Sequence, residues 1–294
     1  MIKATASQLI FFFGIIVIVL LSSCSNTARN AFFVQHEGNT LKLKKEKDLI
    51  VTGGVLNTRG FTFLSDDDIL VKNNRFAFQA AYSPIKYLGV FGLHSRLKIA
   101  DANSPSVTYH KSHITGGGVG SYFFFEFFQR PPHKVLPGRP VKKTKILLDL
   151  YGGYTYGLLD NNYFFPPADA TMNFQKFYLQ GGIHWESSYW SFSYVHKWGR
   201  TNFLNGIING QIDRRDDPAL LAIVNQNNLF FQEATIRAEI KHNGFGLYTQ
   251  FSFGDIIDSG FSSIPDSYIH CGVVVNINDV REYFKERKRI NGER

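Results

Sequence analysis

The chain has little sulfur and no apolar run long enough to cross a bilayer as a helix. Only two of its 294 residues are cysteine and only two are methionine. Two cysteines cannot form a disulfide framework. The longest uninterrupted apolar run, residues 10–21, has twelve residues, whereas a spanning helix needs about 20. This run is therefore too short for a comfortable membrane span.

The same run has the organisation of a secretory signal peptide. Lys3 precedes it, its length lies in the range of a signal-peptide apolar region, and the small residues of Leu21-Ser22-Ser23-Cys24 follow it. The last four residues resemble the lipobox of bacterial lipoproteins, which implies that diacylglycerol is attached to Cys24 and that the chain is cleaved just before it. An ordinary signal peptide or an uncleaved anchor helix are the alternatives. Lipidation would leave Cys271 without a partner.

The resemblance to a lipobox also carries an expectation about location. Ser25 stands where an aspartate would retain a lipoprotein in the inner membrane, and the following residues, 26–30, lack an acidic cluster of the kind that marks surface lipoproteins. We therefore expect the lipid in the inner leaflet of the outer membrane of a Gram-negative bacterium. No cofactor other than this covalent diacylglycerol is expected.

The rest of the chain predicts β-strands. It has 28 Phe, 14 Tyr and 26 Gly, and many segments alternate between two residue classes, which is the period of a strand. In one segment Phe177, Leu179 and Ile183 alternate with Lys176, Gln180 and His184. Ten strands are predicted, at 49–57, 74–83, 87–99, 112–128, 144–158, 172–186, 190–199, 229–241, 244–254 and 267–278.

The connections between these strands alternate in length. Those at 83–86, 187–189 and 242–243 are tight, whereas those at 58–73, 100–111, 159–171, 200–228 and 255–266 are long; 129–143 is the exception. Short turns, long loops and an even strand count are typical of transmembrane β-barrels. We predict an all-β fold: an antiparallel transmembrane barrel of about ten strands, with eight to twelve compatible with the pattern, and both termini in the periplasm. A soluble β domain tethered by the lipid is the competing interpretation.

Four segments follow from this scheme. They are a signal peptide (1–23), a lipidated periplasmic lead-in (24–48), the barrel (49–278) and a charged tail (279–294) that could form a short amphipathic helix. The chain has a formal net charge of +8, and its basic clusters lie in the lead-in, at 130–145 and in the tail. All three map to the predicted periplasmic end. They fit docking to an anionic leaflet or a solvated rim; nucleic acid is not expected as a partner of an exported protein.

A family resemblance supports this scheme. The lipobox, the lead-in motifs at 29–34 and 43–49, and the segment 80–86 resemble a group of uncharacterised outer-membrane barrel lipoproteins of the Bacteroidota. The resemblance implies a fold and a location but no reaction. The chain departs from ordinary outer-membrane barrels at its end, where a charged tail follows the last strand in place of a terminal aromatic residue.

No set of residues predicts catalysis. A His-x-Ser pair on one strand face is absent, and the nine histidines show no metal-binding spacing, so no catalytic or metal residue is assigned. His184 and Glu186 could pair a base with a carboxylate, but a charge network that fills a narrow lumen explains them better. The predicted network comprises Lys176, His184, Glu186, Glu233, Arg237 and Glu239.

Two loop features complete the prediction. The acidic run 66–68 could bind calcium but is better explained as a solvated loop, and Asp217-Pro218 predicts a short outward helix that closes the barrel mouth or meets a partner. We expect a structural, binding or interaction role, with outer-membrane lipids as partners and periplasmic or surface proteins open as others. An enzyme acting on lipid or peptide, and a narrow channel for small solutes, are the alternatives.

Overall fold

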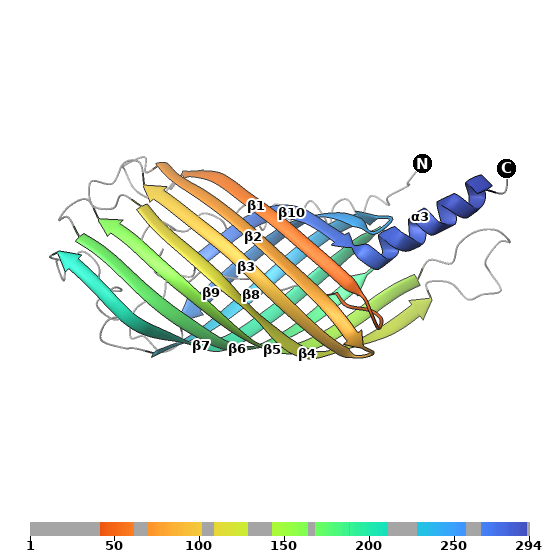
Figure 1. The fold of residues 1–294 in the computed structure, drawn as a ribbon, viewed down its shortest axis with the longest axis horizontal. Helices are drawn as coiled ribbons and strands as arrows, with labels where there is room; N and C mark the ends of the chain where they lie inside the picture. Colours follow the sequence, from red (N-terminus) through yellow and green to blue (C-terminus); the bar gives the residue numbers. More distant parts are fainter. Residues whose placement is uncertain are drawn as a thin grey trace.

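The computed structural model is a closed antiparallel β-barrel followed by one helix (Figure 1). It describes residues 42–61, 70–101, 109–128, 143–163, 168–187, 189–210, 228–256 and 266–292. The strands are β1 (Leu49–Phe61), β2 (Leu70–Ile85), β3 (Leu88–Asp101), β4 (Tyr109–Phe128), β5 (Lys143–Tyr163), β6 (Ala168–Glu186), β7 (Trp190–Gly210), β8 (Asn228–His242), β9 (Phe245–Ile256) and β10 (Asp266–Asn276). The helix is α3 (Ile277–Gly292).

Each strand pairs with its neighbours in sequence, and β1 pairs with β10 to close the sheet. The closing ladder runs from Ile50 opposite Asn276 to Val55 opposite Cys271. Closure removes free sheet edges, so every strand can pair its backbone amides within the barrel. The predicted all-β barrel of about ten strands is confirmed.

The tight turns all lie at one end of the barrel, together with α3, and we call it the turn end (Figure 1). At the β8–β9 turn both central residues have positive φ, 49° at Asn243 and 85° at Gly244. Two consecutive left-handed residues make the hairpin turn whose twist matches the strands, and Asn-Gly is its preferred sequence. Because the strand count is even, β1 begins and β10 ends at this same end.

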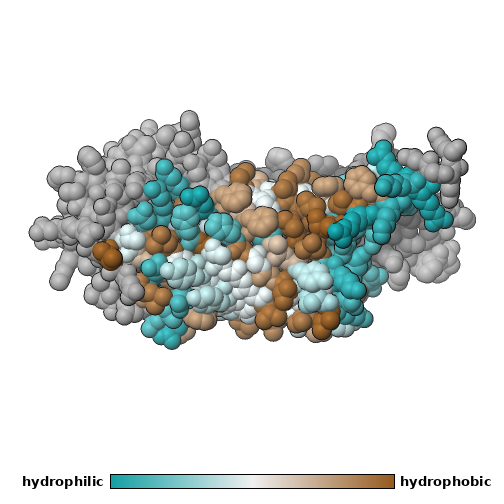
Figure 2. Space-filling view, in the orientation of Figure 1, coloured by the Kyte–Doolittle hydropathy of each residue, from teal (hydrophilic) through white to brown (hydrophobic). Residues whose placement is uncertain are grey.

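The two faces of the barrel wall differ sharply in chemistry. Large apolar side chains point outward and stay exposed, among them Phe177 (50%), Leu179 (49%), Ile183 (55%) and Trp185 (52%) on β6. Their neighbours on the same strand, Lys176 and His184 included, are buried in the lumen. In Figure 2 apolar residues gather across the middle of the visible face, between hydrophilic residues on both sides. This orientation of the faces is that of an outer-membrane-type barrel, and it is the reverse of a soluble β domain.

Aromatic residues are exposed at the turn-end border of the apolar band. Tyr87 stacks on Phe123 with ring centroids 5.5 Å apart, and Trp185 packs against Trp190 at 5.7 Å. Towards the opposite end, Tyr154 and Trp198 are also exposed. Aromatic girdles of this kind are found where a barrel crosses the two membrane interfaces.

The strands are longer than the sequence predicts at the end opposite the turns. β7 extends to Gly210 although 200–228 was expected to be a loop, and β5 and β6 extend over most of the expected loop 159–171. The prediction failed there because outward residues beyond the band, such as Arg200 and Asn202, are polar. The inward residues there are mixed, Thr201 and Phe203 on β7 for example, so the alternation of outward apolar with inward polar residues is lost, whereas the ladder hydrogen bonds continue. The predicted outward helix after Asp217 and the acidic run 66–68 lie outside the described residues.

The last strand ends at Asn276, two residues before the predicted boundary, because this residue caps α3. Its side-chain oxygen accepts hydrogen bonds from the backbone N–H groups of Asn278 (3.0 Å) and Asp279 (3.1 Å), which is the geometry of a helix N-cap. Asp279 in the first turn and Arg289 in the last turn complement the helix dipole. The expected C-terminal helix is therefore present. No helix in the described part of the chain has the length and apolarity needed to cross a membrane.

Candidate functional site

The lumen is filled by side chains along much of its length. Aromatic and aliphatic residues from all ten strands form one buried cluster, which includes Phe91, Ile114, Tyr151, Phe174 and Phe231. The rings of Phe91 and Tyr151 meet edge to face with centroids 5.7 Å apart. A ten-stranded barrel has a narrow interior, so inward side chains of this size occupy it.

A buried carboxylate joins two lysines across three strands of the wall. The Nζ atom of Lys176 lies 2.9 Å from one oxygen of Glu233, and the Nζ atom of Lys197 lies 3.2 Å from the other. All three side chains are at most 4% exposed. The two ammonium groups also lie over aromatic rings, Lys176 over Phe231 and Lys197 over Tyr178, each at 4.5 Å. The carboxylate and the rings together offset the loss of hydration of both lysines.

A second group of charges surrounds Glu239 nearer to the turn end. Its Oε2 accepts hydrogen bonds from Lys42 Nζ at 2.6 Å and from Arg237 at 3.3 Å. The guanidinium of Arg237 lies 3.7 Å from the ring centroid of Tyr248. Lys42 belongs to the segment that precedes the barrel, so this group ties that segment to the wall.

Glu186 and His184 lie in the lumen but are not partners. Glu186 binds Lys44 at 2.6 Å and also pairs with Lys241, whereas His184 Nε2 lies 2.7 Å from Asp149 Oδ2. His184 and Glu186 therefore do not form the base–carboxylate pair that the sequence left open as the alternative to a charge network. Successive inward residues of one strand are about 7 Å apart. Asp149 lies directly opposite Gly182, the inward residue before His184 on β6, and because Gly182 has no side chain the Asp149 carboxylate reaches His184 diagonally.

The His184 site resembles a catalytic arrangement only in composition. Ser193 lies directly opposite His184 in the β6–β7 ladder, so a serine, a histidine and Asp149 lie on three consecutive strands. Neither Ser193 Oγ nor His184 Nδ1 has a hydrogen-bond partner, so these two groups are not bonded to each other. Both residues are at most 1% exposed. Within the described ranges, no three histidine, cysteine or acidic residues are placed to hold a metal ion.

Residues 42–48 cross the barrel mouth at the turn end, and we call them the strap. On one side of the mouth Lys42 donates to Ser191 Oγ at 2.6 Å as well as to Glu239. On the other side the backbone N–H of Lys47 donates to the carbonyl of Ser83 at 2.6 Å. Leu43 between them is fully buried. The end of the predicted lead-in thus lies within the mouth and covers it.

The strap is also joined to α3. Asp48 accepts a hydrogen bond from Asn276 Nδ2 at 3.1 Å, and Asn278 Nδ2 donates to the carbonyl of Lys47 at 2.5 Å. An exposed ion pair links Lys45 with Glu282 at 2.8 Å. Segments from the two ends of the chain therefore meet at the mouth.

Burial and charge change the acidity of the strap side chains in opposite directions. Burial disfavours the ammonium of Lys42 more than the Glu239 carboxylate favours it, and the pKa falls to about 8. Lys44 is also desolvated, but the Glu186 carboxylate outweighs this and the pKa is above its ordinary value. Burial raises the pKa of the Asp48 carboxyl, although the backbone N–H of Lys44 opposes the shift. The strap therefore contains one lysine that titrates near neutral pH.

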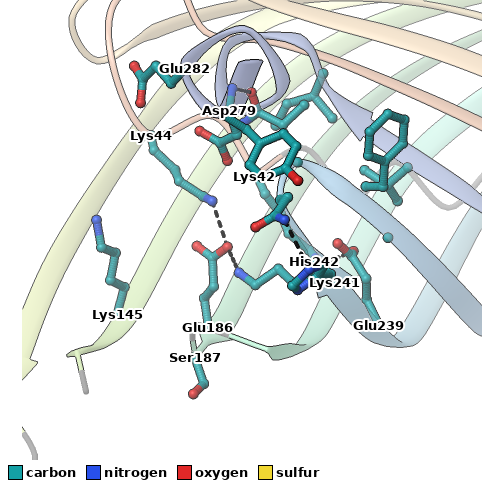
Figure 3. A pocket seen from close by; sticks show the side chains of 18 of the residues that line it. Lys42, Lys44, Lys145, Glu186, Ser187, Glu239, Lys241, His242, Asp279 and Glu282 are labelled. Atoms are coloured by element: carbon teal, nitrogen blue, oxygen red, sulfur yellow. Dashed lines mark hydrogen bonds and ion pairs between the residues drawn. The ribbon is translucent and has the colours of Figure 1, made fainter. Parts of the chain in front are cut away.

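A cavity of about 520 Å³ lies between the strap, the β8–β9 turn and the start of α3 (Figure 3). Its charged lining is nearly balanced in sign: Lys42, Lys44, Lys145, Arg237 and Lys241 face Glu186, Glu239, Asp279, Glu282 and Glu286. In Figure 3 the ammonium groups of Lys44 and Lys241 converge on Glu186. The lining also includes Ile50, Phe245 and Val274, so it suits a small molecule with both charged or polar and apolar parts.

The structure places all six residues of the predicted network in the lumen, where each is at most 6% exposed. Sequence reasoning missed several of their partners, Asp149, Lys197, Lys42, Lys44 and Lys241. Asp149 and Lys197 each fall on the inward face of a strand whose other inward residues include leucine, tyrosine or valine. The inward face is thus not uniformly polar, and alternation alone could not assign them. The strap residues lie outside the strands, so no alternation pattern indicated where their side chains point.

Comparisons with known proteins do not assign this chain to a family. No family model matches the chain, and no curated protein matches it. Among solved structures, the transport unit of the autotransporter AIDA-I from Escherichia coli aligns over 85% of this chain and 95% of its own. The identity is 10% and the TM-score is 0.28.

Proposed function

We propose that this protein is a closed outer-membrane barrel, anchored also by a lipid on Cys24, that serves a structural or binding role at its two ends. The observation that carries the proposal is the lumen: buried charges on the neighbouring strands β5 to β8 pair with each other and with the strap across the mouth. A barrel built to conduct would leave those charges facing water. Here they are neutralised and buried, which favours a rigid body embedded in the membrane.

In this proposal the turn end faces the periplasm. Short turns lie on that side in bacterial barrels, and the strap brings the chain that follows Cys24 to the same end. Lys42 is 18 positions after Cys24 in the sequence, and an extended chain of that length reaches at most about 60 Å. A lipid in the inner leaflet is therefore within reach. The strap, the charged cavity and α3 then form the surface available to a periplasmic partner.

The alternatives fit this geometry less well. A small-solute channel requires an open path past Leu43 and the buried aromatic cluster. An enzyme of the outer membrane requires reactive groups that a substrate can reach, whereas Asp149, His184 and Ser193 lie sealed in the wall. Membership of the Bacteroidota lipoprotein group stays a prediction from the sequence.

Two measurements test the proposal. Mature protein with Cys24→Ala should still require detergent and should migrate differently in a gel before and after boiling, since the barrel alone holds it in the membrane. A detergent-free soluble protein without a heat-dependent shift would contradict the barrel. In planar bilayers the purified protein should show no regular conductance steps, and steps that occur with most insertions would contradict the closed lumen.

A further inference from the structure

Five basic or titratable side chains gather on the outer wall of β3 and β4, just beyond the apolar band and away from the turn end. They are His94, Arg96 and Lys98 on β3 and Lys111 and His113 on β4, and we call them the outer basic patch. All five point outward, because the residues between them, Ser95 and Ser112 among them, are buried in the lumen. In Figure 2 hydrophilic residues border the apolar band on the side away from α3.

The strand register brings like charges face to face in this patch. Lys98 lies directly opposite Lys111, and Arg96 lies directly opposite His113. Directly opposed like charges destabilise a sheet. Asp160 on β5 is opposite Lys111 and compensates part of the charge. Among the residues that the structure describes, Arg96 and Lys98 form no ion pair, and both are exposed.

Below the patch, towards the turn end, the wall carries a stretch of small residues. Gly92 lies opposite Gly117, and the next outward positions are Val90, Val119 and Gly152. A side chain at Gly92 would meet no atom nearer than 3.8 Å, and one at Gly152 would meet none within 4 Å. Exposed rings of Tyr82 on β2, opposite Val90, and of Tyr154 on β5, opposite Gly117, flank this stretch. It is a smooth apolar surface between rings, which suits an extended acyl chain.

We propose that the outer basic patch binds the phosphate groups of a phosphorylated glycolipid of the outer leaflet, with an acyl chain of that lipid on the stretch of small residues. Phosphate requires cations at the headgroup level, and Arg96 provides a planar, bidentate donor for it. The acyl chain requires an apolar surface directly below. The patch and the small-residue stretch are adjacent on the same two strands and supply both. The assignment to the outer leaflet rests on the proposed orientation of the barrel.

The test uses mature protein in detergent, stripped of lipid, and binding of diphosphorylated lipid A followed by native mass spectrometry. The variant Arg96→Gln/Lys98→Gln should bind at least about tenfold more weakly, because each charge-assisted contact contributes about that factor. Lipid A without its phosphates should bind weakly to the unmodified protein. Lys47→Gln/Lys86→Gln removes the same charge from the exposed turn end and should leave binding unchanged. Heat-dependent gel mobility verifies that every variant is folded.

Equal affinity of the wild type and the Arg96/Lys98 variant would overturn the proposal, as would equal loss in the turn-end control. Phosphatidylglycerol or inorganic phosphate that competes as well as lipid A would overturn the choice of a glycolipid. Gly152→Phe should weaken lipid A binding without unfolding the barrel, and unchanged binding would refute the acyl site. Orientation is tested separately: Lys98→Cys should react with an impermeant maleimide on intact cells. Failure of labelling with intact binding would refute the proposed orientation but not the site.

Discussion

Removing the carboxylate of Glu233 should destabilise the barrel more than any exposed charge change. Glu233→Gln would leave Lys176 and Lys197 buried beside a neutral amide, in place of the carboxylate 2.9 and 3.2 Å away. Loss of one partner of a buried ion pair costs about 3–5 kcal/mol because the remaining charge is uncompensated. The rings of Phe231 and Tyr178 offset only part of this. For a domain of this size the cost corresponds to a fall of about 10 °C in the unfolding temperature.

The assay is the temperature at which the folded, fast-migrating form disappears in a gel of unboiled protein. A matched variant separates charge from packing: Lys176→Met/Glu233→Leu/Lys197→Met removes all three charges and keeps similar volumes. It should recover most of the lost stability, because well-packed apolar residues replace buried ion pairs at little or no cost. If Glu233→Gln unfolds at the wild-type temperature, or if the triple variant is as unstable as the single one, the network does not have the role inferred from its geometry.

Three further predictions concern the strap, the helix cap and the outer wall. Lys42 has a pKa of about 8 in the docked strap against an ordinary 10.5, so the docked strap binds fewer protons than the free strap between these two pH values. Docking should therefore strengthen by about 3 kcal/mol as the pH rises through that window. Protease protection of the strap should increase with pH in the wild type, and a similar increase in Lys42→Met would contradict this. Asn276→Ala removes the N-cap of α3 and the hydrogen bond to Asp48, and should lower the folding stability by about 1 kcal/mol or more. The helix content, measured by circular dichroism, should also fall. Unchanged helix content and stability would refute the cap. Ile183→Lys, in the apolar band, should cost about 2–4 kcal/mol of folding stability in lipid vesicles. The control Tyr189→Lys, in a turn, should cost little. Equal effects of the two changes would contradict the position of the band.

The sequence specified the strands best where one face is apolar and the other polar. On β6 the outward Phe177, Leu179 and Ile183 alternate with inward charges, and the predicted 172–186 lies within the observed Ala168–Glu186. Beyond the membrane band the outward residues become polar, whereas inward ones such as Phe203 can be apolar, and β7 continues eleven residues past the predicted end at 199. The ladder hydrogen bonds and the packing of Phe203 against Phe174 maintain that extension, and its irregular pattern gives no strand signal in the sequence.

Partner choice inside the lumen could not be predicted for a different reason. Alternation identified which face Glu186 and His184 share, but their partners come from adjacent strands and from the strap. Lys44 approaches Glu186 from a segment that is 142 residues away in sequence. Register decides such pairs, and register depends on the closure of the whole barrel.

The strap and α3 meet where the barrel is held by its shortest described ladder. β1 pairs with β10 only over Ile50–Val55, whereas it pairs with β2 over Leu49–Phe61. Glycines at 53, 54 and 272 line this seam and contribute no side-chain packing to it. At its turn end, Asp48 just before β1 binds Asn276 at the end of β10, and Lys47 and Lys45 bind Asn278 and Glu282 of the following helix. These bonds hold the first and last strands together from outside the ladder. The strap is the continuation of the chain from Cys24. Under the proposal that Cys24 carries a lipid, this lipid would restrain the seam as well as the protein, and the anchor would have a role beyond retention in the membrane.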